Sequence, residues 1–195
     1  MLDNYINSKL VKSKEYVKEL KKMEVTFLKH AKTDLNGKGY IATKKDYFLN
    51  EIGREECLRN VFSPNSFNSV YCSPYKRTIE TAKIVYPYLE FVILSNLVQR
   101  DLGVLNEKMK KDYSIEYLKS VREYLINPEN AETLEDIMER LNAFFEYIKL
   151  QHDDNSRILV VTHNGIMRII KRFYLNEVNN IDSQNLGQFK MILKK

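Results

Sequence analysis

Apolar and polar positions along the chain follow two alternating patterns. Short apolar runs, typical of buried strands, occur at 25–28, 69–72, 90–94, 157–161 and 188–193. Between and before them, apolar residues recur every three or four positions, which predicts amphipathic helices at 2–22, 46–58, 75–85, 133–150 and 165–174. Strands that alternate with helices predict an α/β fold, with a mainly parallel central sheet covered by helices on both faces.

A single domain over residues 1–195 fits this pattern, because the chain shows no linker, repeat or low-complexity tract. Residues 1–23 are expected to add an N-terminal amphipathic helix that packs on the domain. Membrane contact or a subunit interface, which would give a homodimer, are the alternatives for this helix. The charged segment 107–127 is expected to form a helical insertion over the functional site.

The net charge of +5 is concentrated near the N-terminus, since residues 2–23 hold six lysines against three acidic residues. The remainder is nearly balanced and carries no nucleic-acid-binding motif, so no nucleic-acid partner is predicted. No apolar run approaches the eighteen or so residues that span a bilayer, and no secretory signal is recognisable. The two cysteines, Cys57 and Cys72, have no metal-ligand spacing and suit a reducing compartment. We therefore expect a cytoplasmic protein without a membrane span.

Two of the three histidines follow directly on apolar strands: His30 after the first and His163 after the fourth. In open α/β sheets, ligands bind at the carboxyl ends of the strands. Together with further polar groups at strand ends or helix starts, the two histidines form a cationic set, rich in hydrogen-bond donors, that suits a phosphoryl group. That set comprises Lys29, His30, Thr33, Asn36, Arg77, His163 and the backbone amides of Asn164 and Gly165.

A neutral histidine inside such a set can attack phosphorus itself, while the surrounding positive charge stabilises the transferring oxygens. Two histidines without a third, and without clustered carboxylates, make a poor zinc site. A Walker-type phosphate loop is absent from the sequence. The residues thus predict phosphoryl chemistry without a metal or another cofactor.

Four motifs, in order, resemble the histidine phosphatase superfamily, also called phosphoglycerate mutase-like, over residues 25–193. The family's first motif, Arg-His-Gly-Glu-Thr followed by a later Asn, corresponds to Lys29–Thr33 and Asn36. Its Leu-Thr-x-x-Gly-x-x-Gln-Ala corresponds to Leu49–Cys57. The motif Ser-Pro-x-x-Arg-x-x-x-Thr-Ala is complete at Ser73–Ala82, and Ser/Thr-His-Gly-Gly-x-x-Arg is met by Thr162–Arg168.

This resemblance implies a reaction through a phosphohistidine, with His30 as the nucleophile and with water attacking the phosphoenzyme. Lys29, Arg77 and His163 would hold the phosphoryl group, helped by Asn36. The expected catalytic residues are His30, His163, Arg77 and Asp101, and the expected phosphate-binding residues are Lys29, Thr33, Asn36, Gln99 and Asn164. Arg168 is interpreted as an ordinary helix arginine.

The sequence departs from the family pattern at two important positions. Lys29 replaces an arginine and loses its two-pronged geometry. Gln99 stands where the family has a glutamate general acid, and glutamine cannot protonate a leaving group. Asp101 could substitute, with Glu107 or Glu132 as more distant candidates; Glu132 could instead form a capping pair with Thr133. Alternatively, the leaving group needs little protonation, as in an aryl phosphate, an acyl phosphate or a phosphohistidine.

Taken together, these features predict a metal-independent phosphatase that hydrolyses phosphomonoesters of small metabolites, or phosphoprotein. The alternative is a catalytically degenerate relative that binds a phosphorylated ligand or a protein partner. A phosphoglycerate mutase is less consistent with the missing glutamate and the chain length.

Overall fold

The computed structural model describes residues 23–41, 44–177 and 184–193. The helix predicted over residues 2–22, together with the interface alternatives attached to it, lies outside these residues. Within them, no helix is both long and apolar enough to cross a bilayer.

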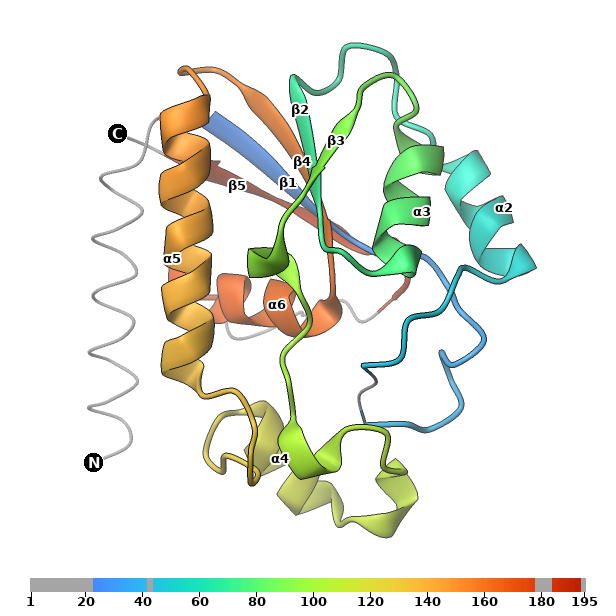
Figure 1. The fold of residues 1–195 in the computed structure, drawn as a ribbon, viewed down its shortest axis with the longest axis vertical. Helices are drawn as coiled ribbons and strands as arrows, with labels where there is room; N and C mark the ends of the chain where they lie inside the picture. Colours follow the sequence, from blue (N-terminus) through green and yellow to red (C-terminus); the bar gives the residue numbers. More distant parts are fainter. Residues whose placement is uncertain (1–22, 42–43, 178–183, 194–195) are drawn as a thin grey trace.

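A five-stranded sheet forms the centre of the molecule, with the strand order β3-β2-β4-β1-β5 (Figure 1). Every neighbouring pair is parallel except β1 and β5, which are antiparallel. The predicted mainly parallel α/β fold is therefore confirmed. The strands are β1 (Met23–Lys29), β2 (Ser69–Cys72), β3 (Phe91–Ile93), β4 (Arg157–Thr162) and β5 (Gln188–Leu193).

Helices cover both faces of this sheet because the side chains of its central strands are apolar on both sides. In β4, Ile158 and Val160 join the core beneath α5 and α6, whereas Leu159 and Val161 join the core beneath α2 and α3 (Figure 1). The helices are α2 (Glu51–Arg59), α3 (Lys76–Val85), α4 (Ile115–Arg122), α5 (Leu134–Gln151) and α6 (Asn164–Ile169), the last continuing into a π-helical turn (Ile170–Tyr174).

The start of α2 is fastened to the loop that follows β1. The Asn50 side chain caps the helix by accepting from the Gly53 amide at 2.9 Å, and the Asn50 amide donates to the Lys32 carbonyl at 3.1 Å. A Cβ on residue 53 would lie 2.2 Å from that same Lys32 oxygen. Glycine at position 53 thus permits a backbone contact next to His30.

We expect Gly53→Ala to lower the free energy of unfolding by about 1–3 kcal/mol, because one backbone segment must move to admit the methyl group. This loss exceeds the gain of about 1 kcal/mol that alanine brings to a helix interior. Urea unfolding measures the difference. Gly165→Ala is the matched control, since its Cβ would meet nothing within 4 Å. A Gly53→Ala protein as stable as the parent would contradict this explanation.

The segment 107–127 is helical over a shorter stretch than the sequence suggested. Its α-helix covers only Ile115–Arg122, after a 3₁₀ turn at Lys110–Asp112. Ser114 caps the start of the helix, and Tyr124 adopts a positive φ of 63° just beyond its end. Helical structure thus occupies part of the segment in which the sequence predicts a helical insertion, and a local cap and a left-handed residue confine its α-helix to Ile115–Arg122.

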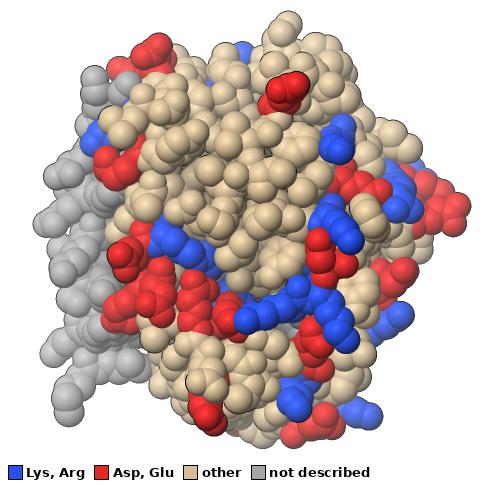
Figure 2. All heavy atoms as spheres, in the orientation of Figure 1, with Lys and Arg blue, Asp and Glu red and all other residues tan. Residues whose placement is uncertain are grey.

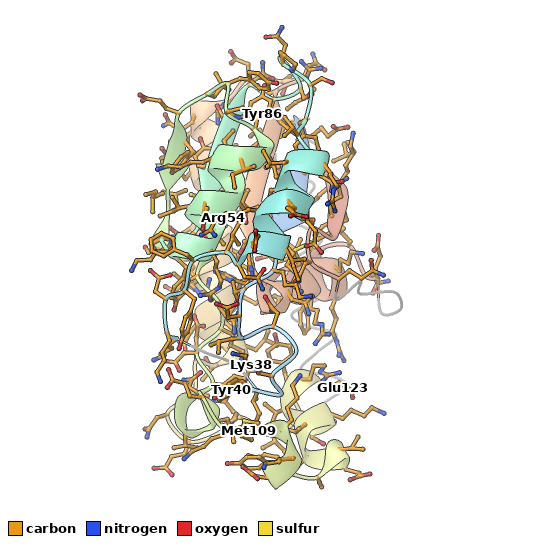
Figure 3. The ribbon with its side chains drawn as sticks, turned by 90° about the vertical axis from the view of Figure 1, so that its right-hand side faces the viewer. Lys38, Tyr40, Arg54, Tyr86, Met109 and Glu123 are labelled. Carbon is orange, nitrogen blue, oxygen red and sulfur yellow. The ribbon has the colours of Figure 1, made fainter. Side chains whose placement is uncertain are left out.

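This segment lies beyond the carboxyl ends of the strands and is joined to the loop after β1 (Figure 1). Tyr40 and Met109 form an isolated antiparallel bridge. On either side of it, the Ile41 amide donates to the Lys108 carbonyl at 2.9 Å, and the Lys110 amide donates to the Gly39 carbonyl at 2.8 Å. Figure 3 shows Tyr40 and Met109 at this junction. The bridge makes one continuous wall from two segments that are distant in sequence.

Candidate active site

Strand register brings the two motif histidines together. The parallel pairing of β1 with β4 matches Lys29 with Thr162, so the residues that follow, His30 and His163, lie side by side. The His30 amide donates to the Thr162 carbonyl at 3.0 Å, and the two imidazole centroids are 5.3 Å apart. Both side chains are buried. The register of β1 and β4 therefore places the two imidazoles next to each other at the carboxyl edge of the sheet.

A hydrogen bond to the backbone carbonyl of the next residue fixes the tautomer of His30. Its Nδ1 lies 2.8 Å from the Ala31 carbonyl oxygen, which can only accept, so Nδ1 carries the proton and Nε2 carries the lone pair. Burial, followed by the positive charge of Arg77, lowers the pKa of His30 to about 3, although the bond to Ala31 opposes this shift and Lys29 adds to it. At neutral pH, His30 is therefore an uncharged imidazole with a nucleophilic Nε2.

A hydroxyl network holds the second imidazole. Nε2 of His163 lies 2.7 Å from the Ser73 hydroxyl, which in turn lies 2.9 Å from the Thr78 hydroxyl. Among the described residues, Nδ1 of His163 has no hydrogen-bond partner although it is buried. Burial, and then the charge of Arg77, lowers the pKa of His163 well below its usual value. Ser73 and Thr78 thus fix the ring of His163, and its Nδ1 is a buried nitrogen beside His30.

Arg77 lies at the start of α3 and is buried, and among the described residues it forms no ion pair with a carboxylate. Its Nη1 donates to the Lys45 carbonyl at 3.3 Å, and its guanidinium stacks on the Tyr75 ring at 4.2 Å. Burial lowers the pKa of Arg77. Buried charges in proteins are paired with an opposite charge, so this arginine is suited to an anionic ligand.

The loop after β1 contributes an amide donor. Oδ1 of Asn36 accepts from the backbone amide of Thr33 at 2.8 Å and from the Thr33 hydroxyl at 3.1 Å. Because the oxygen is used in this turn, the NH₂ group of Asn36 is the part that can donate to a ligand.

These groups border one cavity of about 610 Å³. Seven of the nine predicted site residues line it, and His163 lies buried directly beside His30. Its polar lining from the predicted set comprises Lys29, His30, Thr33, Asn36, Arg77, Gln99 and Asn164. The ninth residue, Asp101, does not line it.

Asp101 lines a smaller neighbouring hollow, which it shares with Gln99 and Glu132. Its carboxylate pairs with Lys44 and accepts from the Gly103 amide at 2.9 Å. Partial burial raises the pKa of Asp101, but the hydrogen bonds, led by that from Lys44, outweigh it and the pKa is lowered. These surroundings favour the ionised form, whereas a general acid must be protonated.

The two more distant candidates for the general acid, Glu132 and Glu107, form ion pairs with other residues. Glu132 forms a two-pronged pair with Arg140, at 2.6 and 3.1 Å, and Glu107 pairs with Lys45 at 3.2 Å. The capping partner of Thr133 is Asp136, not Glu132. The proposed Glu132–Thr133 capping pair was therefore wrong, since a residue three positions into the helix reaches the cap more directly.

Charge is distributed differently inside and outside the cavity. On the face seen in Figure 2, acidic and basic side chains share one band across the molecule. Among the described residues that line the cavity, none is acidic and six are cationic. The six are Lys29, Arg77, Arg100, Lys110, Arg122 and Arg168. The cavity therefore selects anions.

Sequence reasoning missed Arg168 and Ser73 as site residues. Arg168 lines the cavity and is not merely an ordinary helix arginine. Its spacing of four from Asn164 places both on one helix face, which was the available signal. Ser73 belongs to a recognised motif, but its bond to His163 joins residues ninety positions apart, so sequence alone did not reveal its role.

The described residues contain no group of three or more His, Cys, Asp or Glu side chains that could hold a metal ion. Cys57 and Cys72 are buried free thiols, and burial raises the pKa of each to about 12. Neither cysteine is a reactive thiolate at neutral pH.

Comparison with known proteins identifies the family. The family model described as the histidine phosphatase superfamily (branch 1) matches residues 25–191, and the chain belongs to this superfamily. It is 27% identical over 161 residues to a probable phosphatase of Schizosaccharomyces pombe, covering 80% of this chain and 75% of that protein.

Two further proteins are similar to this chain, one in sequence and one in fold. Human 6-phosphofructo-2-kinase/fructose-2,6-bisphosphatase 4 is 28% identical over 159 residues, covering 76% of this chain, which spans about a third (32%) of that protein. The crystal structure of phosphoglycerate mutase from Bacillus anthracis superimposes with a TM-score of 0.71 at 19% identity, covering 90% of each chain. The latter likeness is one of fold.

Proposed function

We propose that this protein is a metal-independent phosphatase that hydrolyses phosphorylated substrates through a phosphohistidine on His30. The observation that carries the proposal is the tautomer of His30, which leaves its Nε2 with the lone pair, on a residue that lines a cavity with six cations among its described residues. The phosphatase relatives and the superfamily support the same reaction class.

In the first step, Nε2 of His30 attacks phosphorus and the bond from phosphorus to the leaving oxygen breaks, with its electron pair leaving on that oxygen. Negative charge spreads over the three remaining phosphoryl oxygens. Arg77 and Lys29, which line the cavity, neutralise that charge, and Ser73 holds the ring of His163 beside His30.

In the second step, water attacks the phosphorus of the phosphohistidine. The N–P bond breaks, its electron pair returns to Nε2 of His30, and phosphate leaves as H₂PO₄⁻ with both protons of the attacking water, one of which it can then release to solvent. The hydrogen bond from Nδ1 to Ala31 keeps the ring in the tautomer needed for the next cycle.

The leaving group determines which phosphate esters react well. Gln99 lines the cavity where an acid would be needed, and Asp101 is ion-paired in the adjacent hollow. We therefore assign to the enzyme substrates whose leaving group is weakly basic, such as aryl phosphates, acyl phosphates or phosphohistidine, because these depart without protonation.

Release of phosphate from p-nitrophenyl phosphate tests the proposal. We expect turnover that is unaffected by chelator and that keeps its nucleophile active down to about pH 4, because the pKa of His30 is about 3. Rapid quenching should trap a phosphoenzyme, with the phosphate on the peptide that contains His30. Turnover that depends on an added metal would contradict the mechanism. Phosphate binding without turnover would support the alternative of a binding protein, which Lys29 and Gln99 favour.

A further inference from the structure

Arg77 is a buried cation that few polar contacts hold in place. Within the described residues, the only hydrogen bond of its guanidinium runs from Nη1 to the Lys45 carbonyl at 3.3 Å, just beyond the usual range for such a bond. The guanidinium carbon also lies 4.2 Å from the centroid of the Tyr75 ring. The direction of the Arg77 side chain therefore depends chiefly on that ring.

Two other arginines, Arg100 and Arg140, are oriented differently, by several hydrogen bonds. Arg100 donates to the Glu132 carbonyl at 3.3 Å and to the side chain of Asn127 at 2.8 Å. Arg140 donates to both carboxylate oxygens of Glu132, at 2.6 and 3.1 Å. Polar partners thus hold these two guanidinium groups, whereas an aromatic face holds that of Arg77.

The backbone of Tyr75 is itself fixed at the point where α3 begins (Figure 1). Tyr75 is the N-cap of this helix, with a φ of −76° and a ψ of 140°. Its carbonyl accepts from the amides of Thr78 and Ile79, each at 3.0 Å, and from the Thr78 hydroxyl at 2.7 Å. The preceding residue is Pro74, whose own ring confines its φ. A side chain on this segment can therefore act as a rigid support.

The Tyr75 ring also contacts the imidazole of His163. The two ring centroids are 5.2 Å apart and the ring planes lie at 87°, an edge-to-face arrangement that aromatic pairs favour. Two residues before Tyr75, the Ser73 hydroxyl lies 2.7 Å from Nε2 of the same imidazole. One short loop after β2 thus restrains both His163, which lies beside His30, and Arg77, whose charge acts on His30.

We propose that Tyr75 is a positioning residue of the active site, whose ring holds the Arg77 guanidinium and the His163 imidazole in the orientation that receives the phosphoryl group. This inference rests on the proposed phosphatase function. It adds a residue that the motif leaves open, because position 75 is the first variable position of Ser-Pro-x-x-Arg.

The role assigned to Tyr75 is indirect. Tyr75 lines the hollow that holds Asp101 and is not among the residues that line the cavity of His30, so it acts through its two neighbours and not on the substrate. A cation held in its binding orientation loses less side-chain freedom when an anion arrives, which strengthens binding.

Substitutions that keep the shape of the ring test its electronic contribution. We expect Tyr75→Phe to retain kcat/KM for p-nitrophenyl phosphate within about threefold, because the aromatic face remains. Tyr75→Leu should lower kcat/KM by about 10- to 30-fold, because Arg77 loses its support. Pentafluorophenylalanine at position 75 has nearly the shape of phenylalanine but lacks its negative face, so it should lower kcat/KM about fivefold or more relative to Tyr75→Phe. Equal turnover of these two aromatic variants would overturn the proposal.

A double-mutant cycle shows whether the ring acts through Arg77. We expect Arg77→Ala alone to lower kcat/KM by about 10²-fold, and Tyr75→Leu to cost less than about threefold more in that background. The same loss in both backgrounds would assign Tyr75 to general packing and overturn the proposal. Tyr88→Leu is the matched control and should retain full turnover, since the Tyr88 ring contacts that of Tyr86 at 5.2 Å and does not line the cavity.

Calorimetry with inorganic phosphate keeps the test independent of turnover. We expect Tyr75→Leu to bind phosphate about tenfold more weakly than the parent protein, and Tyr75→Phe to bind it about equally well. This affinity difference in a parent protein without turnover would refute the proposed function but support the positioning of Arg77. Turnover by the parent protein, with unchanged turnover and phosphate affinity in Tyr75→Leu, would refute the positioning role and leave the phosphatase reaction intact.

Discussion

His30→Ala is expected to lower the turnover of p-nitrophenyl phosphate by about 10⁴-fold or more, because removal of a catalytic nucleophile leaves only the binding contribution of the site. The imidazole beside it is not placed to take over the attack. His163 lies 5.3 Å away between ring centroids, and its Nε2 is bonded to Ser73. Steady-state phosphate release at saturating substrate measures the loss as kcat.

Inorganic phosphate should still bind His30→Ala with an affinity within about tenfold of the parent protein, because Arg77 and Lys29 remain. His152→Gln is the matched control, since this third histidine does not line the cavity and bonds to the Tyr71 hydroxyl at 2.7 Å. We expect it to retain full turnover. Unchanged turnover in His30→Ala would exclude the phosphohistidine mechanism altogether.

The sequence predicted those parts of the site that strand ends determine. Apolar runs located β1 and β4, and the alternation of strands and helices predicted that strands of the sheet run mainly parallel, as these two do. Once Lys29 is matched with Thr162, the proximity of His30 and His163 requires no further information. For this reason the core of the site could be predicted from local patterns and motif order.

Sequence reasoning failed where position depends on contacts between distant segments. The wall of the cavity depends on a bridge between Tyr40 and Met109, and neither segment carries a regular pattern. Asp101 is only two residues from Gln99, yet its bonds to Gly103 and Lys44 hold it in the neighbouring hollow. Such choices among local hydrogen bonds cannot be read from spacing.

None of the described residues that line the cavity is acidic, and this has two linked consequences. A cavity with six cations binds an anionic substrate well, and the same positive potential stabilises the charge of a departing oxygen. A carboxylic acid at position 99 would supply a proton but would also, when ionised, repel the substrate. Under the proposed mechanism, Gln99 limits the leaving groups that react well and keeps the described lining of the cavity free of acidic residues.

Gln99→Glu is accordingly expected to raise kcat/KM for alkyl phosphates by about 10²-fold, the lower range for general acid catalysis by one positioned group. Turnover of p-nitrophenyl phosphate should change little, because its leaving group departs without protonation. The gain should be greatest at acidic pH and decline as pH rises through the pKa of the new carboxyl group, since only the protonated form donates. A pH profile of kcat/KM with glycerol 3-phosphate measures it.

Two variants separate general acid catalysis from other effects of this substitution. Gln99→Ala removes the amide without adding an acid, so it should give no gain with alkyl phosphates. Gln188→Glu makes the same chemical change on the exposed side of β5, away from the cavity, and should leave both substrates unaffected. Gln99→Glu could raise the turnover of alkyl and aryl phosphates equally, or raise neither. Either result would show that the lack of a proton donor does not restrict the substrates. An alkyl-specific gain at low pH would instead assign that restriction to one side chain, at the border between the cavity and the hollow that holds Asp101.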